Sequence, residues 1–322
     1  MNLFRKPVFS KVNLPVIIIF LLYCIFSVIG MLHHEMWRDE LQAWMVARDA
    51  DSFFDLLRNL KYEGNPALWH ILLFVLARFT VSPYSMMVLH LAISFSFVFI
   101  FLFKSNFCML HKLLFVSGYF ILFEYNLVSR SYGLGVLLVF LILSLYRDRR
   151  QKMMLIFILM ALLANTTVYG LILSGAFALL LLSEEFFTEK AIQVQVSKKK
   201  TVTKQKFIFQ WPLLKPAFYA GFLIYITGAV LSALQIYPEP NNTFPVHSPD
   251  PLFNLDRLKL ICANVMNAFF PVPDFSGSHF WNSDYIHWNS FGWTPLFFML
   301  LVVIGLITLL TSVKSNMIIR VK

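Results

Sequence analysis

The residues best suited to chemistry are two adjacent acids, Asp39 and Glu40, in the stretch MWRDELQAWMVARD that follows the first long apolar segment. A positioned carboxylate can act as a general base. Arg130, in the stretch SRSYGL, is a residue type that grips two phosphate oxygens at once. Each also has a structural interpretation: acids near a helix start favour the helix dipole, and an arginine at a membrane surface can contact lipid headgroups. The residues alone leave both interpretations open.

These residues belong to a chain whose composition is that of a multi-pass membrane protein. Of its 322 residues, 58% are hydrophobic and only 14% are charged, and the mean hydropathy is +0.69. The formal charge of +10 is concentrated in short loops and tails, which is typical of cytoplasmic loops, so no nucleic-acid partner is expected. The three cysteines show no CxxC spacing, so neither a disulfide framework nor a zinc site is indicated.

The predicted fold class is an all-α, polytopic transmembrane helix bundle with an outer loop of interfacial amphipathic helices. About eight or nine apolar runs are candidate spans: 14–32, 67–80, 84–103, 112–127, 133–146, 153–166, 169–187, 213–236 and 292–313. Basic segments at 147–152, 198–206 and the C-terminal tail are predicted to be cytoplasmic. This orientation requires one early run not to cross: either 67–80 is the exception, or 67–103 forms one irregular passage.

The acidic loop 33–66 is predicted to lie outside and to form two interfacial helices. The first has an apolar stripe of Trp37, Leu41, Trp44 and Met45, with Asp39 roughly opposite. Ser52 and Asp55 have the spacing of a helix N-terminal cap. In the turn YEGNP, Asn65 is predicted to cap the next helix, with Pro66 at its first position.

Together these features resemble the integral-membrane glycosyltransferases of the C superfamily, including the bacterial relatives of protein O-mannosyltransferases and of the lipid A aminoarabinose transferase. The likeness spans about residues 14–236. It rests on an uncleaved first helix, the W-x-DE of residues 37–40, the EGNP turn leading into ALWHILL, the SRSYGL of 129–134 and the NTTVYG of 165–170. Many such relatives have His where Asn65 stands.

The resemblance implies transfer of a sugar from a polyprenyl-phosphate donor, with inversion, to an acceptor on the extracytoplasmic face of a bacterial inner membrane. Asp39 is the predicted base, and Glu40 is predicted to orient the acceptor or to position Asp39. Arg130 is predicted to hold the lipid phosphate, with Tyr132 donating a further hydrogen bond. Glu63, Asn65 and Tyr169 are the remaining predicted substrate-binding residues. Neither a metal nor a cofactor is expected, and the partners are the lipid-linked sugar, membrane lipid and a glycan, lipid or protein acceptor.

The predicted organisation has a glycosyltransferase-like module at 1–236, a Pro- and aromatic-rich outer loop at 237–291, and a final helix with a basic tail at 292–322. The loop is a candidate lid over the acceptor. Two alternative functions stay open. A noncatalytic partner in cell-envelope glycan assembly would need no base, and a lipid or solute transporter would place acids in mid-helix.

Overall fold

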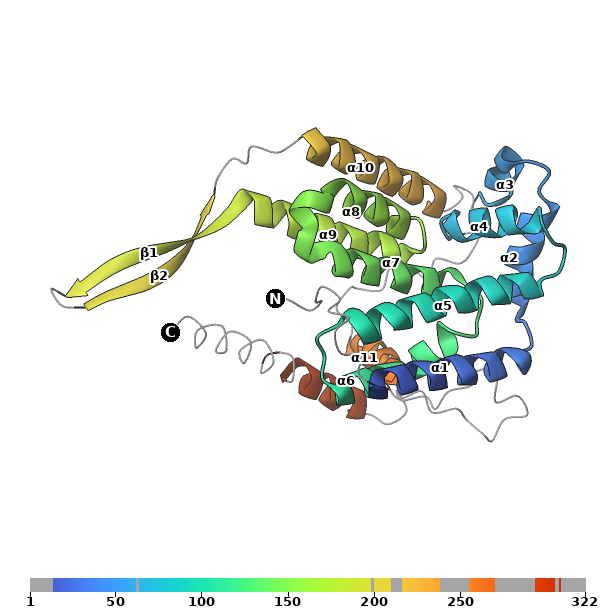
Figure 1. The fold of residues 1–322 in the computed structure, drawn as a ribbon, viewed down its shortest axis with the longest axis horizontal. Helices are drawn as coiled ribbons and strands as arrows, with labels where there is room; N and C mark the ends of the chain where they lie inside the picture. The colour runs from blue at the N-terminus through green and yellow to red at the C-terminus, as the bar shows by residue number, and fades with distance from the viewer. Residues whose placement is uncertain are drawn as a thin grey trace. The chain divides into compact units, whose positions relative to one another are not determined.

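The computed structural model describes residues 14–61, 64–197, 200–209, 216–237, 255–269, 293–304 and 307. It is helical, as predicted, apart from one two-stranded ribbon (Figure 1). The helices are α1 (Leu14–Leu32), α2 (Arg38–Asp49), α3 (Phe53–Asn59), α4 (Leu68–Ala77), α5 (Tyr84–Lys104), α6 (Met109–Val116), α7 (Ser131–Leu145), α8 (Arg149–Ala164), α9 (Val168–Phe186), α10 (Pro216–Ile236) and α11 (Leu255–Phe269). A π-helical turn, η1 (Phe120–Glu124), precedes α7, and a 3₁₀ turn, η2 (Tyr146–Asp148), joins α7 to α8.

The chain divides into two units, Met1–Pro240 and Asn241–Lys322. The first contains α1 to α10 and all the predicted site residues that the structure describes. In the second, the Lys259 ammonium lies 4.7 Å from the centre of the Trp293 ring, which links α11 to a short apolar helix at 294–304. Most of the predicted lid at 237–291 lies outside the described residues.

Four helical stretches are long and apolar enough to cross a membrane: Leu14–Leu32, Tyr84–Lys104, Ser131–Ala164 and Pro216–Ile236. The third consists of α7 and α8 together. A Cβ on Gly135, near the start of α7, would lie 3.4 Å from the hydroxyl of Thr166, just beyond the end of α8. The two helices therefore form an antiparallel hairpin with its turn at η2.

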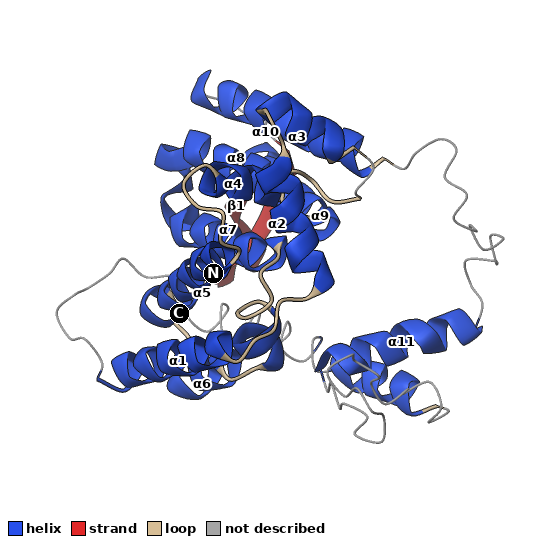
Figure 2. Ribbon diagram, turned by 90° about the vertical axis from the view of Figure 1, so that its right-hand side faces the viewer, coloured by secondary structure: helices blue, strands red, loops and turns tan. Residues whose placement is uncertain are grey.

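The long helices of the first unit alternate in direction, so their connections gather at two ends. Tyr23 of α1 bonds Ser94 of α5, while Phe20 packs edge-on against Phe99 and Phe103 further along α5, so these helices are antiparallel. By similar contacts α8 and α10 are parallel, with Phe157 beside Gly221 and the Ser232 hydroxyl donating to the Ala164 carbonyl. We call the end where α1, α8 and α10 finish and where α5, α7 and α9 begin the site end. It faces the reader in Figure 2.

The predicted exception at 67–80 is a short helix, α4, that lies alongside α2. Trp69, at its start, shares a pocket with Asp39 at the start of α2. At the other end, the Arg78 guanidinium donates to the carbonyls of Arg48 and Ala50, at 3.1 and 2.8 Å, and so caps the end of α2. Ten residues of α-helix extend only about 15 Å. α4 is thus too short to be a separate span.

The apolar run 112–127 is not a regular helix. It consists of α6, which ends at Val116, and the π-helical turn η1. It nevertheless follows α1 toward the site end, because the Tyr23 hydroxyl donates to Ile121 O and the Asn126 amide donates to Ser27 Oγ, at 2.9 and 2.8 Å. An irregular passage here delivers residues 126–130 to the site.

The segment between α9 and α10 contains the ribbon of β1 (Phe187–Ser197) and β2 (Lys200–Phe209), which the sequence analysis did not predict. The strands pair antiparallel, with Lys190 opposite Lys206. Alternating β-branched and polar residues, such as the VQV of 194–196 and the TVT of 201–203, favour this pairing. The lysine-rich content of 198–206 predicted only a cytoplasmic segment.

Gly133, in the first turn of α7, is packed so closely that a side chain would collide with its surroundings. A Cβ there would lie 2.8 Å from the buried His90 ring and 2.9 Å from the Tyr125 carbonyl oxygen. We expect Gly133→Ala to lower stability by about 1–3 kcal/mol, the usual cost of overpacking, as measured by thermal unfolding in detergent. Gly135→Ala is the matched control, because its Cβ meets only Thr166 at 3.4 Å or more. Equal melting temperatures for the two variants would contradict this packing.

Candidate functional site

The first functional element is the start of α2, which Glu40 holds in place. Its side chain is fully buried, and its carboxylate accepts hydrogen bonds from Trp37 N at 2.8 Å, His34 Nε2 at 2.9 Å and Ser129 N at 2.6 Å. Burial alone would raise the pKa of Glu40, but these hydrogen bonds outweigh it and the pKa is lowered. Glu40 is therefore an anion that ties α2 to the segment before α7.

This burial changes the expected orientation of α2. Of the predicted apolar stripe, Trp44 is buried in the protein, whereas Trp37 and Met45 are exposed, as expected of an interfacial helix. The buried stripe instead comprises Glu40, Ala43, Trp44 and Ala47. Its spacing is helical, but it includes an anion, which a hydrophobicity pattern assigns to the solvent face. Asp39, the residue before Glu40, consequently lies on another face of the helix, where it is exposed and lines the site.

Arg130 reaches the site because the segment before it is held at two points. Asn126 donates to Ser27 of α1, and the Ser129 amide donates to Glu40. Arg130 itself is in an extended conformation, with φ −127° and ψ 174°, and α7 begins at the next residue. Its side chain therefore leaves the helix start and points toward α2.

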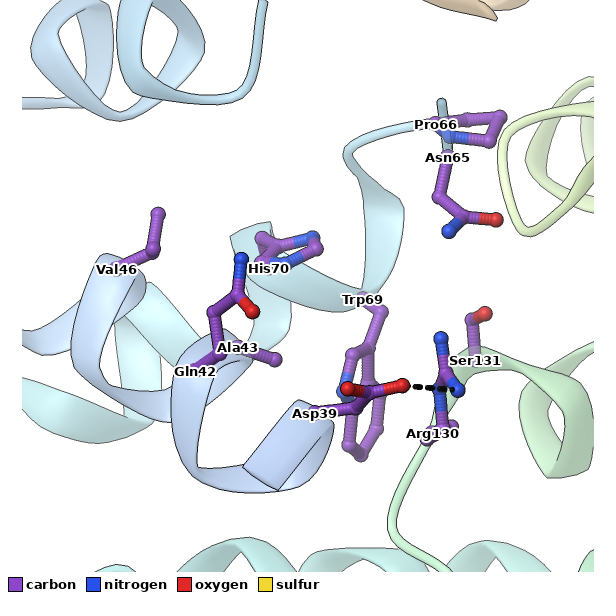
Figure 3. A pocket seen from close by; sticks show the side chains of 10 residues that line it. All are labelled: Asp39, Gln42, Ala43, Val46, Asn65, Pro66, Trp69, His70, Arg130 and Ser131. Carbon is purple, nitrogen blue, oxygen red and sulfur yellow. Dashed lines mark hydrogen bonds and ion pairs between the residues drawn. The ribbon is translucent and has the colours of Figure 1, made fainter. Parts of the chain in front are cut away.

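Asp39 and Arg130, 91 residues apart in the sequence, form an ion pair with Arg130 Nη1 2.9 Å from Asp39 Oδ2 (Figure 3). They line a pocket of about 250 Å³, which we call the polar pocket. Its lining residues are Asp39, Gln42, Ala43, Val46, Asn65, Pro66, Trp69, His70, Arg130 and Ser131. The predicted base and the predicted phosphate ligand thus lie in one site.

The turn before α4 places Asn65 in this pocket, although not for the predicted reason. The prediction that Asn65 caps α4 is wrong: the N-cap is Ala67, and no side chain caps the helix. The backbone amides at the helix start instead donate to distant residues. Ala67 N donates to Gln235 Oε1 of α10 at 2.7 Å, and Leu68 N donates to the Asn165 carbonyl at 3.2 Å. Because those groups satisfy the helix start, the Asn65 side chain faces the pocket instead (Figure 3).

The NTTVYG segment at 165–170 mainly supports the site and contributes little to the lining of the pockets. The Asn165 amide donates to the Gly228 carbonyl at 2.9 Å, and Thr166 and Thr167 are buried. The segment thereby fixes α8 and α9 against α10. Tyr169, which is 74% exposed, is the residue of this segment that lines a pocket.

Tyr169 lines a second pocket, the aromatic pocket, on the other side of Arg130. Its volume is about 440 Å³ and it is lined by Trp37, Phe120, Glu124, Tyr125, Val128, Arg130, Tyr132 and Tyr169. The Arg130 guanidinium carbon lies 5.6 Å from the centre of the Tyr132 ring, within cation–π range. Arg130 therefore forms a wall of both pockets.

The structure thus brings Asp39, Asn65 and Arg130 together in the polar pocket, and Tyr132 and Tyr169 beside Arg130 in the aromatic pocket. Glu40 lies behind the site, and Glu63 lies outside the described residues. Ser131 and His70 also line the polar pocket, although neither was among the predicted site residues. Their positions in the sequence could have identified both residues, because Ser131 follows Arg130 directly and His70 is one helical turn from the EGNP turn.

The fold and the site define a helical bundle, four of whose apolar stretches can span a membrane, with two adjoining pockets at one end. Among the described residues, no group of three or more His, Cys, Asp or Glu side chains is placed to hold a metal ion. Comparison of the chain with protein-family models, curated proteins and solved structures gives no match.

Proposed function

We propose that the chain is a membrane glycosyltransferase that moves a sugar from a polyprenyl-phosphate donor to an acceptor at the outer face. The observation that carries this proposal is the Asp39–Arg130 pair, in which a carboxylate and a guanidinium from distant segments meet at 2.9 Å between two pockets. Such a reaction needs both groups. One receives the proton of the nucleophile, and the other stabilises the departing phosphate.

In the proposed reaction, an acceptor hydroxyl oxygen attacks the anomeric carbon from the side opposite the phosphate. The new C–O bond forms as the bond from the anomeric carbon to the phosphate oxygen breaks, and the configuration inverts. Asp39 takes the hydroxyl proton, and Arg130 binds the polyprenyl phosphate that leaves with the bonding electrons. The donor phosphate competes with Asp39 for Arg130, so donor binding frees the carboxylate to act as a base.

The bundle also suits a site at the outer membrane surface. With α1, α5, the passage 109–127, α7, α8, α9 and α10 as crossings, both basic connections, at 147–152 and 198–206, fall on the side opposite the site. α2, α3 and α4 then lie at the outer face. On α3, where Ser52 accepts the predicted capping bond from Asp55 N, Phe53 and Phe54 are exposed, as expected of side chains that face lipid.

The transporter alternative receives less support from the same helices. α1, α5, α7, α8 and α10 contain neither Asp nor Glu, whereas a transporter would place acids in mid-helix. A noncatalytic partner would have no need for a base next to a phosphate ligand. A sugar-transfer assay separates this noncatalytic role from catalysis.

The test is transfer of radiolabelled sugar from a panel of polyprenyl-phosphate donors in membranes that contain the wild type or Asp39→Asn at equal abundance. We expect the substitution to lower transfer by about 10²–10⁴-fold, the usual contribution of a general base. Asp49→Asn, at the exposed far end of the same helix, is the matched control and should retain wild-type transfer. Equal transfer by Asp39→Asn and wild type would refute the assignment, and no transfer from any donor would favour the noncatalytic partner.

A further inference from the structure

Besides the Trp69 indole N–H, three polar side chains of the polar pocket make no hydrogen bond within the part of the chain that the structure describes. They are the Asn65 amide, the His70 imidazole, whose Nδ1 is buried without a partner, and the Ser131 hydroxyl. They come from three separate elements: the turn before α4, the first turn of α4 and the first turn of α7. Buried polar atoms are usually satisfied, so the buried His70 Nδ1, in a cluster of unused donors and acceptors, indicates a ligand that satisfies it.

The chemical character of this cluster is neutral, in contrast to the ion pair beside it. Burial, with a smaller contribution from Arg130, lowers the pKa of His70 to about 4, so the imidazole is uncharged at neutral pH. One ring nitrogen then donates and the other accepts. An amide and a hydroxyl can likewise do both. Such groups match ligand hydroxyls, each of which also donates and accepts.

The size and walls of the pocket restrict the ligand further. Its volume of about 250 Å³ is below the range of about 300–1,000 Å³ typical of drug-sized ligands, so it accommodates a single ring and not an extended chain. The Trp69 indole forms one wall next to Asp39 (Figure 3). An indole offers an apolar surface on which the C–H face of a sugar ring can pack.

We propose that the polar pocket binds one sugar ring through its hydroxyl groups, with His70 and Ser131, alongside Asn65, as specificity-determining contacts. The inference deepens the proposed function and rests on it only for the source of the ring. That source is either the donor sugar or the terminal unit of a glycan acceptor. Asp39, on the same wall, then lies within the site that holds the ring.

Binding can be tested without any transfer reaction. The full-length chain, purified in detergent, is titrated calorimetrically with methyl glycosides of common hexoses and pentoses. We expect at least one glycoside to bind, and we expect Ser131→Ala and His70→Phe each to weaken it by about twofold to tenfold, the loss of one hydrogen bond. His111→Phe, on the exposed surface of α6 at the opposite end, should bind as the wild type does. If no glycoside binds, or if the pocket variants bind equally well, the inference is wrong.

The transfer assay then identifies the source of the ring. If the pocket holds the donor sugar, His70→Phe raises the KM for the donor, and it slows donor hydrolysis when the acceptor is omitted. If it holds an acceptor glycan, only the KM for the acceptor rises. Glycoside binding without transfer from any donor would overturn the proposed function and leave the pocket assignment standing. Transfer by a wild-type protein that binds no glycoside would support the proposed function and overturn the pocket assignment.

Discussion

Replacing Glu40 with Ala is expected to lower the free energy of unfolding by about 3–5 kcal/mol, the cost of breaking a buried charged network. The substitution removes the acceptor for Trp37 N, Ser129 N and the His34 ring at once, and it leaves buried donors without partners. It should also detach residues 126–130 from α2. Thermal unfolding of the protein in detergent measures the effect.

The control for this prediction is Asp39→Asn, the neighbouring acid, whose side chain is 56% exposed. It should melt within a few degrees of the wild type, whereas Glu40→Ala should melt far lower. Glu40→Gln should fall between them, because an amide oxygen still accepts hydrogen bonds but carries no charge. If Glu40→Ala and Asp39→Asn melt together, Glu40 does not hold the site together.

Acid should weaken the same network in the wild type. The folded pKa of Glu40 is lowered, so its contribution is fully present above the unfolded value of about 4.3. As the pH falls below that value, the unfolded state takes up the proton first and the contribution is progressively lost. The difference in stability between wild type and Glu40→Ala should therefore shrink between neutral pH and pH 3.

Arg130→Ala has the second large expected effect, a loss of transfer of about 10²–10³-fold, the usual result of removing one group that stabilises developing charge. Arg130 is the cationic side chain lining both pockets, so Ala leaves neither with a phosphate ligand from this position. Radiolabelled transfer at saturating acceptor is the measurement.

Arg130→Lys is the informative companion. Lysine keeps the charge but loses the planar fork, so partial activity is expected. Arg38→Ala, at the first position of α2 and outside the linings of both pockets, is the control and should retain transfer. Wild-type rates in Arg130→Ala would show that another group holds the phosphate.

Much of the arrangement is visible in the sequence because it depends on local patterns. Hydrophobic runs give the helices, and the Ser52–Asp55 cap is observed as predicted. That one early apolar run, such as 67–80, does not cross the membrane follows from the positions of the basic loops, which allow one crossing fewer than the number of apolar runs. Asp39, Arg130 and Asn65 were selected by residue type and context, and the polar pocket contains all three.

What the sequence could not supply depends on contacts between distant segments. The cap of α4 comes from Gln235 and Asn165, so no local signal marks it. Glu40 is buried because Ser129, 89 residues away, donates to it. The irregular passage after α6 is likewise held by side chains on α1, Tyr23 and Ser27. In each case a distant partner overrides the local preference.

The bond between Ala67 N and Gln235 Oε1 joins residues 168 positions apart, and it has a consequence for biogenesis. At about 5–20 residues per second, the ribosome needs roughly ten to thirty seconds to make the intervening chain. Throughout that interval the turn carrying Asn65 has already been translated while its anchor does not yet exist. The polar pocket is therefore among the last features to mature during synthesis, and only after α10 is in place.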